Sequence, residues 1–195
     1  MNGTTTVSLF GVGGQGILLA ASLLAEAAAA EGLEVKASEV HGMAQRGGSV
    51  VSTVRFGERV YSPVTHHADY VIATELLEGI RGLRLLGPGG TVVCASTTRI
   101  PPGGVLRREE SYPDELEKEA AARGVRVISV DAATLAKEAG TLRAVNIALM
   151  GAASTVLPFS AESWQTALER AVPAKIFAVN EKAFALGRAS VVTTA

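Results

Sequence analysis

Short segments that are almost wholly apolar alternate along this chain with longer segments rich in alanine and leucine, and this alternation restricts the possible folds most. A strand that is apolar along its whole length is buried on both of its faces. Strands of this kind, separated by helices, are typical of a mainly parallel sheet that helices cover on both sides. The sequence therefore predicts an α/β fold.

The predicted elements follow from apolar periodicity and from the residues that interrupt it. Strands are expected at Thr5 to Phe10, Leu33 to Val40, Ser49 to Phe56, Tyr70 to Thr74, Gly90 to Ala95 and Arg126 to Val130. Helices are expected at Gln15 to Glu31, after Thr74 through Leu86, and at Glu115 to Arg123, Ala132 to Ala139, Ala144 to Val156, Ala161 to Ala171 and Lys175 to Ala189. The chain thus ends in a helical C-terminal part.

Two further predictions concern the connections between these elements. Gly57-Glu58 follows the third strand as a tight turn into Arg59-Val60-Tyr61, which predicts a β-hairpin. No repeat or long flexible linker divides the chain, so residues 1–195 are expected to form a single domain.

Charge and length exclude several classes of function. The 195 residues include 19 acidic and 18 basic side chains, so no basic excess favours nucleic acid or a membrane surface as partner. The first 25 residues carry no charge, but glycines interrupt them. The apolar run from Ile17 to Ala25 is shorter than the roughly 20 residues that a membrane span requires, so we expect no membrane segment.

A single cysteine, Cys94, adds two constraints. It cannot form an internal disulfide, which favours a cytoplasmic location. It also cannot hold an iron–sulfur cluster by itself, because a cluster takes about four protein ligands. Cys94 closes an apolar segment, so we expect a buried and unreactive thiol.

The segment Gly11-Val12-Gly13-Gly14-Gln15-Gly16 lies directly after the first predicted strand and opens the first helix, and it matches G-x-G-x-x-G. Glycines permit a tight turn there, and the start of a helix favours an anion. NAD binding also requires an acidic residue at the end of the second strand, and neither Glu34 nor Glu39 is well placed for this role. The motif indicates either an anion site or a closely packed turn without a ligand.

A second glycine-rich segment, His41-Gly42-Met43-Ala44-Gln45-Arg46-Gly47-Gly48-Ser49, separates the second and third predicted strands. Its three glycines permit positive φ and expose backbone N–H groups. Arg46 adds a guanidinium suited to phosphate or carboxylate. We interpret the segment as a loop that meets a polar ligand or a partner subunit; the alternative is a tight turn in which Arg46 pairs with an internal acid.

Other polar or unusual side chains are expected to be structural. His66 and His67 are adjacent and point to opposite sides of an extended chain, so they do not form a metal-ligand pair. Asn146 and Asn180 stand in apolar helices, where each amide needs hydrogen-bond partners and is expected to tie its helix to a loop rather than to reach a site. Trp164 is expected in the core, after an N-cap at Ser160 and in a hydrophobic staple with Phe159.

In this order, the two glycine-rich segments resemble those of the gamma-type subunits of 2-oxoacid:ferredoxin oxidoreductases. The resemblance is carried by Gly11 to Gly16 and by Glu39 to Gly48. Within the second segment, His41 to Gly48 is most similar to the beta subunits of indolepyruvate:ferredoxin oxidoreductases. The pattern continues through Asn146 to Gly151 and Asn180 to Gly187, so it spans nearly the whole chain.

The resemblance implies a Rossmann-like three-layer sandwich that serves as one subunit of a complex. Such a complex oxidatively decarboxylates a 2-oxoacid to an acyl-CoA and passes two electrons to ferredoxin. Thiamine diphosphate, magnesium and iron–sulfur clusters are expected on the larger partner subunit. The isolated chain is accordingly expected to bind none of them, to be colourless and to be inactive.

The resemblance also implies where this chain meets its ligand or partner. Coenzyme A is a candidate ligand at the subunit interface, and no residue of this chain is expected to perform the covalent chemistry. The turn facing the ligand or partner is expected to consist of Gly11, Gly13, Gly14, Gln15 and Gly16. The loop nearest the active site between the subunits is expected to contain His41, Gln45, Arg46, Gly47 and Gly48.

Alternatives remain open at this stage. The substrate implied by the His41 to Gly48 segment is indolepyruvate or another aryl pyruvate, but pyruvate, branched-chain 2-oxoacid and 2-oxoglutarate complexes share the domain. A stand-alone nucleotide-binding protein and a ligand-free assembly module are alternatives of other classes. Tight NAD binding by the isolated chain would favour the nucleotide-binding protein, whereas co-purification with a large, brown, thiamine-containing partner would favour the oxidoreductase subunit.

Overall fold

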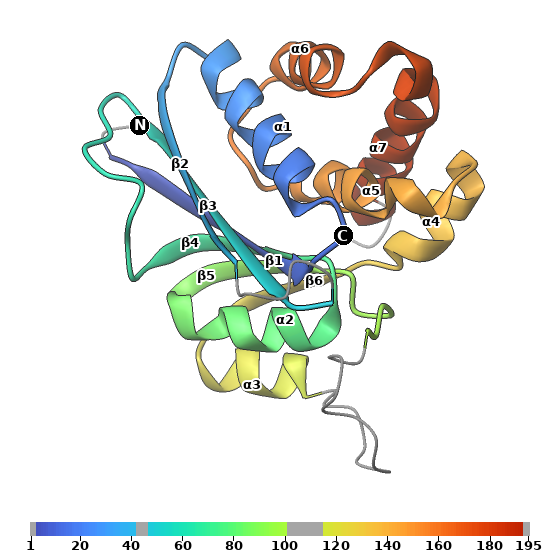
Figure 1. Ribbon diagram of the computed structural model, residues 1–195. Helices are drawn as coiled ribbons and strands as arrows, with labels where there is room; N and C mark the ends of the chain where they lie inside the picture. Colours follow the sequence, from blue (N-terminus) through green and yellow to red (C-terminus); the bar gives the residue numbers. More distant parts are fainter. Residues whose placement is uncertain (1–2, 42–46, 101–114, 193–195) are drawn as a thin grey trace.

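A six-stranded mixed sheet forms the centre of the computed structural model, which describes residues 3–41, 47–100 and 115–192 (Figure 1). The strand order is β2-β3-β1-β4-β5-β6. β1, β4, β5 and β6 run parallel, whereas β3 is antiparallel to both of its neighbours, β1 and β2. The strands are β1 (Thr5–Val12), β2 (Glu34–His41), β3 (Ser49–Gly57), β4 (Ala68–Ala73), β5 (Leu86–Cys94) and β6 (Arg126–Ser129).

The predicted hairpin after the third strand is wrong. β3 pairs along its length with β1 on one side and β2 on the other, with Phe56 opposite both Thr5 and Val35. Both edges of β3 are therefore occupied, and no edge remains for a returning strand. Residues 58–67 run as irregular chain to the start of β4, and the antiparallel connection lies instead between β2 and β3.

Helices cover the sheet on both sides, which confirms the predicted α/β fold with three layers and a helical C-terminal part (Figure 1). The larger helical layer contains α1 (Ile17–Ala30), α4 (Ala132–Ala139), α5 (Val145–Ala153), α6 (Ala161–Ala171) and α7 (Phe177–Val192). The smaller layer contains α2 (Leu76–Gly82) and α3 (Leu116–Ala122). Three short 3-10 turns, η1 (Leu83–Leu85), η2 (Leu142–Ala144) and η3 (Ala174–Ile176), join elements of these layers.

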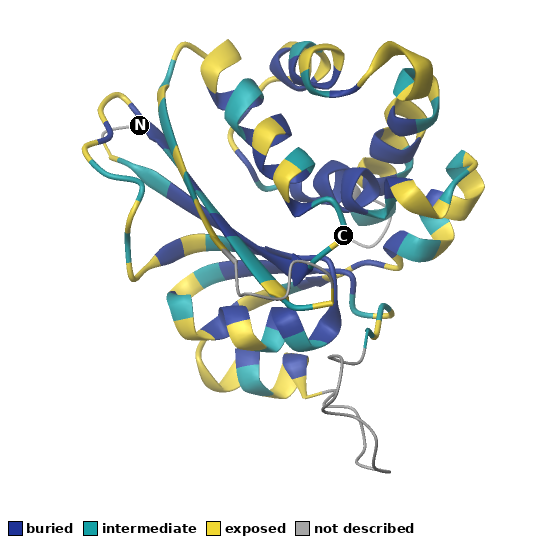
Figure 2. Ribbon diagram, in the orientation of Figure 1, coloured by how far each residue is buried: buried dark blue, intermediate teal, exposed yellow. Residues whose placement is uncertain are grey.

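Each helical layer packs on its own apolar core, and Figure 2 shows the buried helix faces turned toward the sheet. Alternating strand residues supply the two cores, so that Leu9 of β1 faces the larger layer and Phe10 faces the smaller one. This two-sided burial explains why the strands read as continuous apolar segments. In the part of the chain that the structure describes, no helix has the length and apolar character needed to cross a membrane.

The start of α6 forms as its sequence predicts. The Ser160 hydroxyl accepts a hydrogen bond from the Ser163 N–H at 3.1 Å, and the rings of Phe159 and Trp164 pack with their centroids 5.5 Å apart. Trp164 is fully buried, as expected. The Glu31 carboxylate, which follows α1, accepts from the Ser160 N–H at 2.6 Å, and this backbone hydrogen bond lowers the pKa of Glu31.

Two glycines allow α5 and α7 to pack closely against each other. A Cβ atom on Gly187 would collide with the backbone carbonyl of Ala148, and one on Gly151 would collide with the carbonyl of Phe184. Side chains at these positions would force the helices apart, so the glycines allow the backbones to approach each other.

We predict that Gly187→Ala destabilises the chain by about 1–3 kcal/mol, because the overpacked α5–α7 contact outweighs the better helix propensity of alanine. Gly87→Ala is the matched control, since a Cβ at Gly87 has no neighbouring atom within 4 Å. Chemical denaturation of both variants measures the difference. Equal stabilities of the two variants would contradict the interpretation of Gly187 as a packing glycine.

Candidate functional site

The two halves of the sheet diverge between β1 and β4. The helix that follows β1 lies on one side of the sheet, and the helix that follows β4 lies on the other (Figure 1). In open α/β sheets such a change of side leaves a crevice at the carboxyl ends of the two strands, where ligands commonly bind. The first glycine-rich segment follows β1 at this point, and Thr74 and Glu75 follow β4.

Three positions of the first glycine-rich segment require glycine, each for its own structural reason. Gly14 and Gly16 adopt positive φ values of 104° and 73°, which side-chain-bearing residues rarely adopt. A Cβ on Gly11 would collide with Thr74 and Ile17, so the strand end and the helix start approach closely there. The Asn146 amide donates to the Gly16 carbonyl at 3.0 Å, which confirms that this amide ties its helix to a loop.

Gln15 holds the turn against the end of β4. Its Oε1 accepts hydrogen bonds from the Val12 N–H and the Thr74 hydroxyl, both at 2.8 Å. Its Nε2 donates to the Thr74 carbonyl at 3.1 Å. The side chain thus fixes the shape of the turn and joins two neighbouring strand ends.

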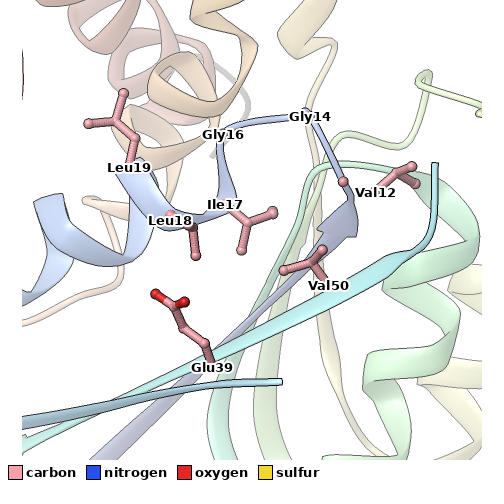
Figure 3. Close-up of a pocket in the computed structure, with 9 residues that line it drawn as sticks. Val12, Gly14, Gly16, Ile17, Leu18, Leu19, Glu39 and Val50 are labelled. Atoms are coloured by element: carbon pink, nitrogen blue, oxygen red, sulfur yellow. The ribbon is translucent and has the colours of Figure 1, made fainter. Parts of the chain in front are cut away.

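The start of α1 faces an open hollow of about 600 Å³ (Figure 3). Gly16 occupies the N-cap position and offers no side chain, and the first turn contains no acidic residue. The backbone N–H groups at the start of a helix lack intrahelical partners, so this end carries a partial positive charge. The hollow is otherwise mainly apolar, with a lining that includes Val12, Ile17, Leu18, Leu19 and Val50.

Glu39 adds a carboxylate to this hollow. Figure 3 shows its side chain directed from β2 toward Ile17 and Leu18 at the start of α1. The sequence predicts that Glu39 is poorly placed to bind the ribose of NAD, and this stays a prediction; its carboxylate nevertheless lines the hollow. β3 lies between β2 and β1, but the Glu39 side chain points to the side of the sheet that α1 covers and so reaches the hollow.

The second glycine-rich segment meets the first through the backbone. The Gly13 N–H donates to the Gly48 carbonyl at 2.8 Å, and the Gly47 N–H donates to the Gly13 carbonyl at 3.3 Å. Gly47 has a positive φ of 76°. The structure therefore brings the described parts of the two motifs together, whereas Gln45, Arg46 and the side chain of His41 lie outside the described residues.

Two buried acids beside this contact escaped the sequence analysis. The Glu78 carboxylate accepts from the Ser49 hydroxyl at 2.6 Å and pairs with Arg81 at 2.5 Å. The Glu75 carboxylate caps α2 by accepting from the Glu78 N–H at 3.0 Å. Acidic residues directly after an apolar strand are a recognisable helix-start signal, which could have indicated them.

Two other side chains that the sequence singled out, those of Cys94 and Asn180, are buried within the fold. Cys94 is fully buried, and burial together with the charge of Glu75 raises the pKa of its thiol. The Asn180 amide donates to the Ile176 carbonyl at 2.7 Å. Among the described residues, no group of three or more His, Cys, Asp or Glu side chains is arranged to hold a metal ion, and His67 belongs to no such group.

Residues 6–190 match the family model described as pyruvate ferredoxin/flavodoxin oxidoreductase. The chain belongs to this family. The match spans both glycine-rich segments and all the described strands except the first residue of β1.

Curated relatives of this family member are indolepyruvate oxidoreductase subunits named IorB. The subunit from Thermococcus kodakarensis is 40% identical over 93% of both chains, and that from Pyrococcus horikoshii is 40% identical over 93% of both. Among solved structures, the gamma subunit of a keto/oxoacid ferredoxin oxidoreductase from Geobacter sulfurreducens has a TM-score of 0.75. The two chains are 23% identical, and the alignment covers 97% of this chain and 99% of the Geobacter subunit, which supports the fold.

For this family member we predict that Gln15→Glu lowers stability by about 1–3 kcal/mol at neutral pH, because a carboxylate oxygen would replace the amide donor that faces the Thr74 carbonyl. That environment disfavours the charged form, so the folded-state pKa of the new carboxyl should be raised. The loss should then shrink as pH falls and the carboxyl is protonated. Thermal unfolding as a function of pH measures both effects, and an unchanged Tm at neutral pH would refute the role of Gln15.

Proposed function

We propose that the chain is the smaller subunit of an indolepyruvate:ferredoxin oxidoreductase complex. The observation that supports this most strongly is the 36–40% identity to four IorB subunits over nearly their full lengths. In this proposal the complex oxidatively decarboxylates indolepyruvate or another aryl pyruvate to an acyl-CoA and passes the electrons to ferredoxin. The residues of the His41 to Gly48 segment supported the same substrate class.

The chemistry of the reaction is assigned to the larger partner subunit. Thiamine diphosphate with magnesium would supply the decarboxylation there, and iron–sulfur clusters would carry the electrons to ferredoxin. The present chain has a single cysteine and does not fit a cluster. Its own contribution is to complete the complex and to help bind coenzyme A.

The hollow beside the glycine turn suits coenzyme A in three respects. The uncapped start of α1 favours a phosphate group, and the apolar walls suit a largely aliphatic chain. The Glu39 carboxylate repels a second anion but accepts hydrogen bonds from hydroxyl or amide groups, which coenzyme A also carries. We assign Gly11, Gly13, Gly14, Gln15 and Gly16 to this site, with Gly47 and Gly48 at its border and His41, Gln45 and Arg46 as further members expected from the sequence.

A second substrate class also has support among the relatives. A ketoisovalerate oxidoreductase subunit VorA from Methanothermobacter marburgensis is 33% identical over 74% of this chain, although the match covers 27% of that relative. A pyruvate/ketoisovalerate common gamma subunit from Pyrococcus abyssi is 30% identical over 91% of each chain. Pyruvate and branched-chain 2-oxoacids are therefore the alternative substrates.

We predict that the chain, co-expressed with its larger subunit, forms a brown complex that reduces ferredoxin with indolepyruvate and coenzyme A. A panel of indolepyruvate, phenylpyruvate, pyruvate, 2-oxoisovalerate and 2-oxoglutarate identifies the substrate through kcat/KM. Higher kcat/KM for the branched-chain acid or pyruvate would replace the substrate assignment, and a colourless chain that binds NAD tightly without a partner would overturn the proposed function.

We further predict that Leu18→Glu raises the KM for coenzyme A at least about tenfold, because it places a carboxylate beside the proposed phosphate position. Leu18 is half exposed, and an acid in the first turn of a helix is compatible with folding. Ser22→Glu is the matched control, one turn further along the same helix face and outside the hollow. An unchanged KM in Leu18→Glu would exclude the hollow as the coenzyme A site.

A further inference from the structure

One part of the sheet lacks a helical cover on the side of α2. On that side, α2 packs against β1, β4 and β5, and α3 packs against β6. Among the described helices, α2 reaches only the start of β3, through the Glu78–Ser49 hydrogen bond and the contact of Val51 with the smaller core, and Figure 2 shows β2 and β3 with many intermediate and exposed residues. We call this strip the open face. It consists of Lys36, Ser38 and Val40 on β2 and of Val51, Thr53 and Arg55 on β3.

Cross-strand register organises the open face into three pairs. Lys36 lies opposite Arg55, Ser38 opposite Thr53 and Val40 opposite Val51. Directly opposed residues of antiparallel strands point to the same side of the sheet. The open face therefore changes along the strands from a cationic pair through a hydroxyl pair to an apolar pair.

At the cationic end of the open face, Arg55 has no acidic partner among the described residues. Like charges directly opposite each other on a sheet are unfavourable. Lys36 contacts Glu34 at 3.5 Å, whereas the Arg55 guanidinium donates to the neutral Thr6 hydroxyl at 3.2 Å and the Ser62 carbonyl at 2.6 Å. In residues 3–41, 47–100 and 115–192, no carboxylate lies within ion-pair distance of Arg55. An acidic group from outside these residues would relieve the repulsion.

The apolar end of the open face is exposed. Val40 is 69% exposed, and the neighbouring Val51 is only partly buried against the smaller core. Parallel and mixed sheets of this class normally bury such residues under a third layer. The exposed apolar side chain of Val40 and the unpaired Arg55 suit a surface that a protein partner covers, since arginine is enriched at protein interfaces.

We propose that the open face docks the larger subunit of the complex. The docking segment of that subunit carries a carboxylate that pairs with Arg55 and an apolar side chain that covers Val40 and Val51. The two positions are about 13 Å apart, since four residues separate Arg55 from Val51 along the strand. This inference rests on the proposed function, because it requires the complex to exist.

The charge pattern argues against a second copy of this chain as the occupant. A two-fold contact would bring two identical open faces together. Each cationic pair would then face either the other cationic pair or the apolar pair of Val40 and Val51. Neither arrangement supplies the carboxylate that Arg55 lacks, so a different chain with an acidic surface fits better.

Paired variants of the full complex test the docking surface. Val40→Asp is expected to weaken binding of the tagged larger subunit at least about tenfold, because it buries an unpaired carboxylate at the apolar end. Leu142→Asp is its control, because Leu142 is also exposed but lies in η2 within the larger helical layer. Lys36→Glu is expected to weaken binding several-fold at low salt and less at high salt. The exposed Lys175→Glu is the control for charge reversal.

Binding is measured by co-purification and titration, and circular dichroism and Tm establish that each variant is folded. Wild-type affinity in both Val40→Asp and Lys36→Glu would overturn the docking surface, and so would equal losses in the controls. If Val40→Asp fails to fold, Lys36→Glu and its salt dependence decide the question. A wild-type chain that does not bind the larger subunit would instead overturn the proposed function.

Discussion

The amide of Gln15 joins the ends of β1 and β4, and the architecture around the site depends on this junction. Its three hydrogen bonds, to the Val12 N–H and to the hydroxyl and carbonyl groups of Thr74, fix the glycine turn where the sheet divides. Asn146 holds the following residue, Gly16, from α5. With both ends of the turn held by side chains, the backbone of Gly13 and the start of α1 are free to face the hollow and the second glycine-rich segment.

Local patterns predicted much of the fold. The helices α4 and α6 begin and end at the residues that apolar periodicity and capping predicted, and the end of β1 differs by two residues. Pairing between strands was the weak point, because it depends on residues far apart in sequence. The Gly57-Glu58 turn looked like a hairpin, but the position of β3 between β1 and β2 left no free edge. Propensity carries no information about which edges are already occupied.

The candidate site was predicted in part for the same reason. Glycines at a strand–helix boundary have a local signature, so the first motif was visible in the sequence. Its contact with Gly47 and Gly48 is a backbone interaction that no side-chain pattern reveals. The position of Glu39 on the lining of the hollow depends on the pairing of β2 with β3, which the residues around Glu39 do not reveal. Glu78 was missed because one of its two partners, Ser49, is distant in sequence; the other, Arg81, lies one turn further along α2.

The hollow and the open face lie on opposite sides of the same two strands. Glu39 and Val40 are adjacent in β2, so their side chains point to different sides of the sheet. A partner bound over Val40 would therefore leave the hollow beside Glu39 accessible to a small ligand. In the proposed complex, a strand pair covered on one side by the larger subunit would hold the glycine turn rigidly against its ligand.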